Sequence, residues 1–592
     1  FEQVIGLEIQ GNYSRSLPQK SFKVVARGSY GKSSIDYQFF PDKAIISFKQ
    51  IILRNAGNDW NNLHFRDAAI HKLSQKKTDL DVQDYQPCLV FINGKYWGVY
   101  NIREKINKDY IAENHGVNPD SVDLLQYNGF VMSGTKENFE QFATFAYFND
   151  LSDSANYEVI KSWLDIENFI DYFVVETYSE NGDWLSNNVV FWREQKNGAK
   201  WRHILWDLDF FGTGWWPFTA SSLDSNLNKP YSYQSIIFNK LVQNTEFRHQ
   251  FINRYADLMN TIFTPYYLKN FVASIHDTLD AEMPRHFERW GNGFNDTTYG
   301  LGGQGTYFDW KNFNLSQLNM FINYRQATAR NQIENTFSLK KQVPVTFNVY
   351  PPGAGKIQIN TIEIDSFPWA GIYFDSVPIT ITAVPNPGYE FAFWQSNKLI
   401  PDPDFNQSVK INLDTNDVFT AYFFGSPDTN RITISEINYK SAPSLDAGDW
   451  VELHNYGTVD VDISGWTFQD SNVLNIFKIP DSTSIAAGGY LVLAQDTAKF
   501  KITHPGVVNV IGSFIFGLGG GSEKLRLFDK SGSLYLSMSY SGLSPWPFKA
   551  NGQGGTLELL DPYNDLSSYY NWFDGCFGGS PGKGFSPCIV GM

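Results

Sequence analysis

Two short acidic motifs carry the residue types that could do chemistry. The first, "ENGDWLSNNVVFW", places Asp183 and Asn188 five positions apart just before an apolar run. The second, "HILWDLDFFG", places Asp207 and Asp209 at the end of another apolar run. Carboxylate and amide oxygens are the ligands that hard divalent cations prefer. Because neighbouring carboxylates repel one another, we expect a cation between the two motifs.

This spacing is typical of proteins that transfer phosphoryl groups. In such sites a carboxylate positions the attacking hydroxyl, an Asn follows five residues later, and a metal-binding Asp stands just ahead of a glycine. Asp183 and Asn188 match the first part, and Asp207 or Asp209 with Gly212 matches the second. On a strand the two later carboxylates would point the same way, so both could reach one cation.

The same residues also fit other interpretations. They could be turn and strand-end residues, or ligands of a structural calcium ion. Asp-x-Asp also occurs in metal-dependent glycosyltransferases, so binding of a sugar nucleotide is a further alternative.

A nucleotide would also need cations near its phosphates. The stretch "SRSLPQKSFKVVAR" supplies Arg15, Lys20, Lys23 and Arg27, of which Lys23 lies inside a strand-like run and Lys20 at its start. Glu104, in "NIREKI", is a carboxylate that could orient such a lysine. Each lysine also fits a solvated position on an amphipathic strand.

Other nucleotide and metal motifs are missing or poorly placed. "GLGGQG" at 300–305 matches the dinucleotide fingerprint, but no strand precedes it and no helix follows, so we interpret it as a loop. There is no Walker A pattern and no serine nucleophile elbow. The nine histidines form no HxH or HExxH pattern, which makes a preformed zinc site improbable.

The elements that position the motifs can be predicted from periodicity. Up to about residue 130 short runs alternate, and the turn at Asn93–Gly94 joins two of them, which predicts an antiparallel sheet with a hairpin. From about 137 to 180 the period is helical, with Asp165 as the N-cap of a helix that leads into the first motif. We expect later helices capped by Thr245 and over 314–336, and hence an α+β two-lobed domain.

Composition divides the rest of the chain. With 592 residues the chain is too long for one hydrophobic core. Near Lys340 short strands broken by Pro and Gly begin, and a second series starts at "RITISEINY". We therefore expect a multidomain chain, with an α+β domain over 1–340, a small all-β module over 341–427 and an immunoglobulin-like β-sandwich over 428–592.

Bulk composition limits the partners. The formal net charge is -15, which disfavours binding to nucleic acid. No stretch approaches eighteen apolar residues, so we expect no transmembrane segment. Aromatic residues make up 16% of the chain, so stacking on a cell-surface glycan is an alternative to core packing. Cys576 and Cys588 flank a Gly/Pro-rich loop and could form a disulfide or stay free thiols.

An ordered set of blocks over residues 1–338 resembles the CotH family of secreted atypical protein kinases. The blocks are "SRSLPQKSFKV", "IILRNAGNDW", "PCLVFINGKYWGVYNIREKI", "NGDWLSNNVVFW", "HILWDLDFFG" and "FRHQFINRYADLMNT". The resemblance implies an atypical protein-kinase-like two-lobed fold, with ATP and Mg²⁺ or Mn²⁺ as cofactors. It also implies residue roles: Asp183 as catalytic base, Asn188 and Asp207 or Asp209 as metal ligands, and Lys23 or Lys20 with Glu104 as the pair on the phosphate side.

The later segments resemble modules of exported proteins. The stretch from "ISEINYK" to "WTFQD", followed by "AAGGYLVLA", resembles a lamin-tail domain, and 341–425 is similar to small β-repeat modules of bacterial surface proteins. This implies an extracytoplasmic protein, secreted or at the cell surface, which we expect to be a monomer. The expected function is phosphorylation of exported proteins, and the alternative is an inactive kinase-like adhesin or glycan-binding protein.

Overall fold

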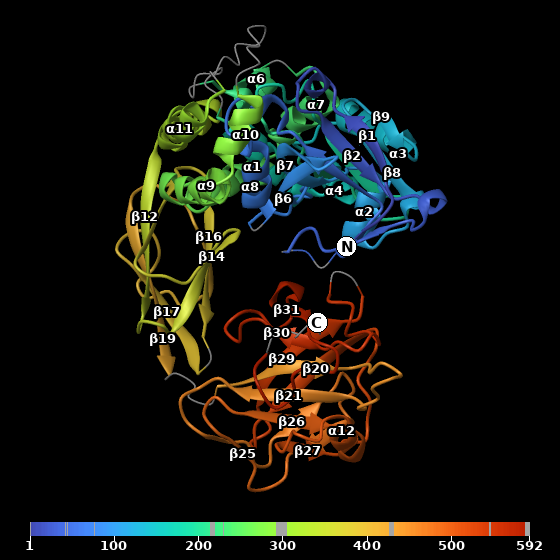
Figure 1. Cartoon of the computed structure of the whole chain (residues 1–592). Coiled ribbons are helices and arrows are strands. Elements are labelled where there is room, and N and C mark those ends of the chain that lie inside the picture. The colour runs from blue at the N-terminus through green and yellow to red at the C-terminus, as the bar shows by residue number, and fades with distance from the viewer. Residues whose placement is uncertain are drawn as a thin grey trace. The chain divides into compact units, whose positions relative to one another are not determined.

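The computed structural model describes the chain apart from residues 1, 42, 44, 76, 213–219, 229, 292–304, 387, 426–430, 544–545 and 586–592. The chain divides into two compact units, Phe1–Ser426 and Pro427–Met592 (Figure 1). In the part of the chain that is described, no helix is long and apolar enough to cross a membrane. The "GLGGQG" loop lies almost wholly outside the described residues.

A five-stranded antiparallel sheet begins the first unit. The predicted hairpin is confirmed: Asn93 and Gly94 join two of the strands with φ values of 53° and 73°, the positive angles that a type I′ turn requires. Helix α1 (Arg66–Gln75) lies between two strands of this sheet in the sequence. The order across the sheet is β1 (Gly6–Gln10), β2 (Ser21–Val25), β5 (Gln50–Arg54), β7 (Lys95–Glu104) and β6 (Tyr85–Ile92).

Helices dominate the rest of the first unit up to Thr336. A second sheet, β11-β10-β8-β9, accompanies them, formed by β8 (Val122–Gln126), β9 (Phe130–Ser133), β10 (Val190–Glu194) and β11 (Arg202–Ile204). The helices are α2 (Lys108–His115), α3 (Glu137–Phe148), α4 (Ser154–Trp163), α5 (Ile166–Ser179), α6 (Ser222–Asn228), α7 (Tyr233–Leu241), α8 (Thr245–Met259), α9 (Pro265–Asp280), α10 (Met283–Trp290) and α11 (Leu315–Thr336).

The predicted helix caps are confirmed at one helix and wrong at another. Asp165 caps α5, and its side chain accepts a hydrogen bond from the Asn168 N–H at 3.3 Å. At α8 the cap is Asn244, one residue before the predicted Thr245, because the Asn244 side chain accepts from the N–H groups of Glu246 and Phe247.

Helix α5 is the central buried element of the helical region. Every residue from Asn168 to Ser179 is buried, as expected of a helix that is apolar on most sides. The ring of Phe173 stacks on that of Phe238 from α7, with centroids 4.1 Å apart and planes 7° apart. Because α5 is held on all sides, the loop that follows it starts from a fixed position.

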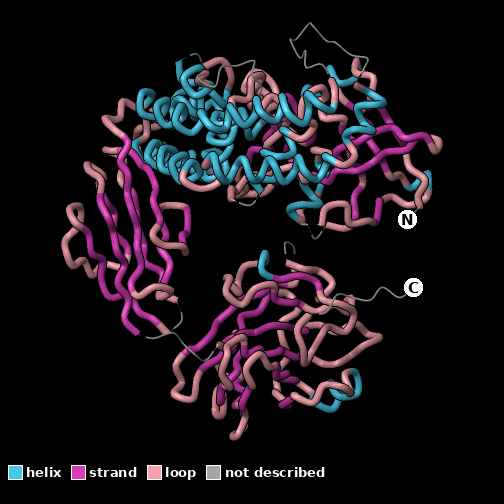
Figure 2. The backbone as a smooth tube through the Cα atoms, turned by 60° about the vertical axis from the view of Figure 1, so that its left-hand side comes forward, coloured by secondary structure: helices cyan, strands magenta, loops and turns pink. Residues whose placement is uncertain are grey.

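Two four-stranded sheets follow the helices and belong to the same compact unit (Figure 2). Their apolar residues join the core of the helical region without a break. The domain boundary that the sequence predicts near residue 340 is not tested by this and stays a prediction. One sheet contains β12 (Gln342–Tyr350), β15 (Trp369–Phe374), β17 (Tyr389–Ser396) and β19 (Asp417–Gly425), and the other contains β13 (Gly355–Ile359), β14 (Ile362–Ile364), β16 (Ile379–Pro385) and β18 (Ser408–Ile411).

The second unit is rich in β-strands, as predicted. Its two larger sheets share one core, to which Ile434 and Val451 contribute from one sheet and Leu525 and Met538 from the other. One sheet contains β20 (Ile432–Asn438), β21 (Trp450–Asn455), β26 (Tyr490–Ala494), β27 (Val510–Gly512), β30 (Leu557–Leu559) and β31 (Trp572–Asp574), and the other contains β23 (Thr467–Gln469), β24 (Ile476–Lys478), β28 (Ser522–Phe528) and β29 (Leu534–Ser541).

The cysteines differ in state. Cys88 is a free thiol, and Cys576 is disulfide-bonded. Cys588 lies outside the described residues.

Candidate active site

The first acidic motif forms a tight loop between α5 and β10. Asn188 donates from Nδ2 to both carboxylate oxygens of Asp183, each at 3.0 Å, and Asn187 Nδ2 donates to Asp183 Oδ2 at 3.1 Å. Asn188 has a φ of 59°, a left-handed conformation that Asn tolerates better than most residues. The predicted pair is therefore in direct contact.

The second acidic motif does not lie on a strand, so that expectation is wrong. Strand β11 ends at Ile204, and Asp207 has a φ of 64°, which turns the chain out of the extended conformation. The two carboxylates nevertheless reach one cation. Arg54 Nη2, from the end of β5, contacts Asp207 Oδ1 and lies 2.8 Å from Asp209 Oδ2.

The two motifs meet at Asp207. Its backbone oxygen lies 3.5 Å from Asn188 Nδ2 and 3.3 Å from Asn181 Nδ2. Burial and then the negative charge of Asp207 raise the pKa of Asp183 to about 6. The structure thus brings Asp183, Asn188 and Asp207 together, and it connects Asp209 to them through Arg54.

Asp207 and Asp209 have different environments. The Asp207 side chain is 26% exposed and that of Asp209 is 1% exposed. Asp209 Oδ2 accepts from the backbone N–H of Asn58 at 2.8 Å, and Oδ1 accepts from Asn58 Nδ2 at 3.1 Å. Asp209 is held from several directions, whereas Asp207 is partly exposed.

Asp67 on α1 fastens the second motif to the first sheet. Its Oδ1 accepts from the Leu208 N–H at 2.9 Å, and its Oδ2 pairs with Arg103 from β7. Burial alone would raise the pKa of Asp67, but the positive charges of Arg103, His71 and Arg54 lower it well below its usual range. Asp67 is therefore an ionised anchor beneath the second motif.

Two buried oxygens beside the first motif are not paired in the described part of the chain. Glu176 Oε1 and Asn181 Oδ1 are buried without a hydrogen-bond partner among the described residues. Burial, together with the charges of Asp183, Asp67 and Asp207, raises the pKa of Glu176 well above its usual value. A carboxyl with so raised a pKa stays protonated, which leaves the unpaired amide oxygen of Asn181 as a hard acceptor that a divalent cation could use.

A metal ion here would need ligands from a bound molecule as well. Within the described ranges, no group of three or more His, Cys, Asp or Glu is placed to hold an ion. Mg²⁺ commonly uses one or two carboxylates and completes its shell with phosphate oxygens and water. Asp207 and the amide oxygen of Asn188 fit that pattern.

Lys23 and Glu104 lie on opposite faces of the first sheet. Lys23 is opposite Ile52 and Ile52 is opposite Arg103, so Lys23, Arg54 and Arg103 share the face of the acidic motifs. Lys23 Nζ pairs with Glu8 at 2.7 Å.

The predicted pairing of Glu104 with Lys20 or Lys23 is not made. Glu104 instead pairs with Lys43 at 2.6 Å and accepts from Asn114 Nδ2 at 2.9 Å. Lys20 Nζ donates to the backbone oxygens of Arg15 and Leu17, each at 2.6 Å. Arg15 is exposed and donates to the backbone oxygen of Ile9 at 3.2 Å.

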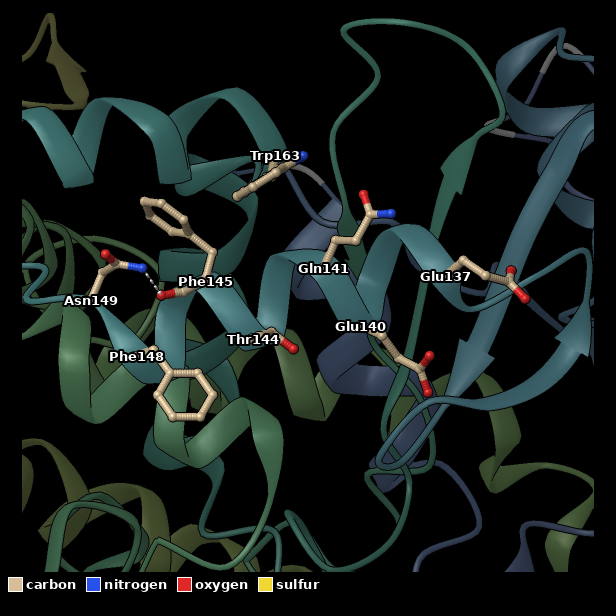
Figure 3. Close-up of a pocket in the computed structure, with 8 residues that line it drawn as sticks. All are labelled: Glu137, Glu140, Gln141, Thr144, Phe145, Phe148, Asn149 and Trp163. Carbon is tan, nitrogen blue, oxygen red and sulfur yellow. Dashed lines mark hydrogen bonds between the residues drawn. The ribbon is translucent and has the colours of Figure 1, made fainter.

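A surface hollow of about 630 Å³ lies along α3, and the residues of the acidic motifs are not among those that line it (Figure 3). Its polar side chains do not converge, and Phe148 points to the other side of the helix from Phe145 and Trp163. A binding site needs a few convergent polar groups, so the hollow is a weaker candidate than the acidic motifs. It is lined by Glu137, Glu140, Gln141, Thr144, Phe145, Phe148, Asn149 and Trp163.

Sequence reasoning missed Arg54, Asp67, Arg103 and Glu176. Arg54, Asp67 and Arg103 lie at least twenty residues from their main partners, so local spacing does not reveal them. Glu176 lies in a helix whose sequence is typical of a buried core helix. The available signal was a charged residue inside an apolar run: Arg54 ends "QIILR" and Glu176 lies within "FVVETY". A buried charge of this kind needs a partner.

Comparisons with known proteins give two family matches. The model described as CotH kinase protein matches residues 7–329, more than half of the chain, and the model described as Lamin Tail Domain matches residues 426–542. No curated protein matches. One solved structure that resembles part of the chain is a DUF4876 family protein from Bacteroides thetaiotaomicron, at 9% identity, covering 43% of this chain and 97% of that one. Its TM-score of 0.18 supports no conclusion on the fold.

Proposed function

The chain belongs to the CotH kinase protein family, and on that premise we propose that the first unit is a kinase-like phosphotransferase. It moves the γ-phosphate of ATP to hydroxyl side chains of exported proteins. The observation that carries the proposal is the contact between Asp183 and Asn188 beside Asp207. These are the three residue types that phosphoryl transfer needs, at the spacing it needs.

The proposed lobes follow from the two sheets. The first lobe contains the five-stranded sheet with α1, and the second contains β11-β10-β8-β9 with the helices from α3 onward. The acidic motifs belong to the second lobe, Arg54 contacts them from the first, and Lys23 lies on the same sheet face as Arg54. A nucleotide between the lobes would therefore meet cations on one side and metal ligands on the other.

The proposed roles follow from position and charge. The oxygen of the acceptor hydroxyl bonds to the γ-phosphorus, and Asp183 accepts the proton of that hydroxyl. The bond between the γ-phosphorus and the bridging oxygen breaks, and that oxygen leaves with ADP. With a pKa raised to about 6, Asp183 is mostly ionised at neutral pH and can act as that base. Asn188 and Asp207 would hold Mg²⁺ or Mn²⁺, which neutralises charge on the phosphates. Lys23 would approach the phosphates from the first lobe.

The test is phosphate transfer from labelled ATP. The chain is incubated with Mg²⁺ or Mn²⁺ and a generic acceptor protein, and incorporated label is measured. Asp183→Ala is expected to abolish incorporation, and Asp120→Ala, which removes an exposed carboxylate paired with Lys108, is expected to leave it unchanged. Label that persists unchanged in Asp183→Ala would show that the assigned base is wrong.

Calorimetric titration separates this proposal from the adhesin alternative. Binding of ATP that depends on the metal supports the phosphotransferase. Glycan binding without nucleotide binding supports an inactive adhesin. A thermal shift that is larger with a UDP-sugar than with ATP would instead support glycosyl transfer, since a ligand of the folded state raises the melting temperature by mass action.

We also propose an extracytoplasmic location for the chain. Cys576 is disulfide-bonded, and disulfides persist mainly in oxidising compartments. The lamin-tail match suggests a presenting or tethering module, to which we assign no chemistry.

A further inference from the structure

Arg54 stands where a metal ion would otherwise balance the second acidic motif. One nitrogen, Nη2, contacts Asp207 Oδ1 and lies 2.8 Å from Asp209 Oδ2. The guanidinium is largely buried, with 17% of the side chain exposed. Arginine is always charged, so the site carries a permanent internal cation.

The two carboxylates hold Arg54 unequally. Asp209 is fully buried and also accepts two hydrogen bonds from Asn58, so it cannot turn away from Arg54 without losing them. Asp207 is more exposed, and within the described residues the donor to its side chain is Arg54. The contact with Asp207 is therefore the one that can open while Arg54 stays anchored.

Arg54 also has unused donor capacity. Its Nε is buried and has no acceptor among the described residues. Both of its contacts use Nη2. The guanidinium therefore does not make the pair of parallel hydrogen bonds with which arginine binds a phosphate. The Arg54 guanidinium therefore has donors without acceptors, and it would gain hydrogen bonds if a ligand brought acceptor oxygens to it.

We propose that Arg54 is an internal counter-ion that holds Asp207 until nucleotide binds, and that it then donates to the phosphate oxygens while Asp209 anchors it. This inference rests on the proposed function. It assigns metal binding to Asp207 and positioning of Arg54 to Asp209. Arg54 and a divalent cation compete for Asp207 in the nucleotide-free chain, whereas a triphosphate gives both of them ligands, so the two cations then bind together.

If Arg54 and the metal ion compete, one variant should change the affinity for metal alone and the affinity for metal with nucleotide in opposite directions. Mn²⁺ binding is measured by titration calorimetry, first alone and then with the non-hydrolysable analogue AMP-PNP. Arg54→Met is expected to bind Mn²⁺ alone about tenfold more tightly than the unmodified chain, and to bind Mn²⁺ with AMP-PNP about tenfold more weakly. Arg285→Met removes an exposed arginine of α10 that pairs with Glu282, and it is expected to change neither affinity.

A purely structural role for Arg54 would weaken both kinds of binding together, and that result would overturn the inference. If Arg54→Met fails to fold, Arg54→Lys keeps the charge but lacks the guanidinium fork, and the same opposite signs are expected at smaller size. An unmodified chain that binds AMP-PNP neither with nor without Mn²⁺ would overturn the proposed function itself. The two failures are thus distinguishable.

Discussion

Asn188 Nδ2 lies 3.0 Å from each carboxylate oxygen of Asp183. The contact uses the nitrogen of the amide, so the Asn188 oxygen is directed away from Asp183. On the proposed function, one side chain can therefore hold Asp183 in place with its nitrogen and offer its oxygen to a cation. This double use explains why an amide, and not a third carboxylate, stands at this position.

On the proposed function, Asn188→Ala removes a metal ligand as well as a hydrogen bond, so it is expected to raise the Mg²⁺ concentration needed for half-maximal phosphate transfer by at least about tenfold. The measurement is a Mg²⁺ titration of labelled phosphate incorporation at saturating ATP. Asn187→Ala is the matched control, since Asn187 also donates to Asp183, at 3.1 Å, but is not assigned to the metal. Equal Mg²⁺ requirements in the two variants would contradict the role of Asn188.

Gly57→Ala is expected to destabilise the chain by about 2 kcal/mol more than Gly94→Ala. Both glycines have positive φ, 64° and 73°, so an added Cβ strains both backbones. At Gly57 the Cβ would also stand 2.3 Å from Asp209 Oδ2 and 2.7 Å from Arg54 Nη2, whereas at Gly94 it would meet nothing within 4 Å. Urea unfolding of the two variants measures the difference. Equal losses in the free energy of unfolding would show that Asp209 and Arg54 move aside from the added Cβ at no energetic cost.

Local patterns were enough to place the first motif. The five-residue spacing of Asp183 and Asn188 and the cap at Asp165 lie within one helix and the loop after it, so short-range rules applied. The hairpin at Asn93–Gly94 was predictable for the same reason, because its turn type depends on two adjacent residues.

Long-range contacts could not be predicted from spacing. The partners Arg54 and Asp209 are 155 residues apart, and Asp67 and Leu208 are 141 residues apart. The left-handed conformation of Asp207 is imposed by these contacts and overrides the extended pattern of the preceding residues. The sequence therefore predicted which residue types meet at the site but not the arginine that joins them.

Asp257→Ala is expected to destabilise the first unit by about 2–4 kcal/mol, because it leaves several buried donors without an acceptor. Asp257, on α8, accepts from the hydroxyl of Tyr373 at 2.8 Å and from the N–H and hydroxyl of Thr361 at 3.1 and 2.6 Å. Calorimetric unfolding should show the helices and the adjacent sheets losing stability together. Asp365→Ala, at an exposed position, serves as the control. A loss confined to the sheets would indicate that they fold independently of the helices.

The second unit contains three buried glutamates on neighbouring strands. Glu436 on β20 lies directly opposite Glu452 on β21 and Glu558 on β30. Burial raises the pKa of Glu452 to about 8, and burial with the charges of the other two raises the pKa of Glu436 well above its usual value. These groups therefore favour the folded state when they are protonated.

Because the folded pKa of Glu452 lies above its unfolded value near 4.5, its stabilising contribution is complete below about pH 4.5 and is lost as the pH rises through about 8. We expect the calorimetric transition of the second unit to move to lower temperature between pH 5 and pH 9. Glu452→Gln should flatten that dependence, since the amide stays neutral. Glu523→Gln, on β28 of the same unit, should leave it unchanged. An unaltered pH dependence in Glu452→Gln would show that Glu452 is already ionised in the folded chain.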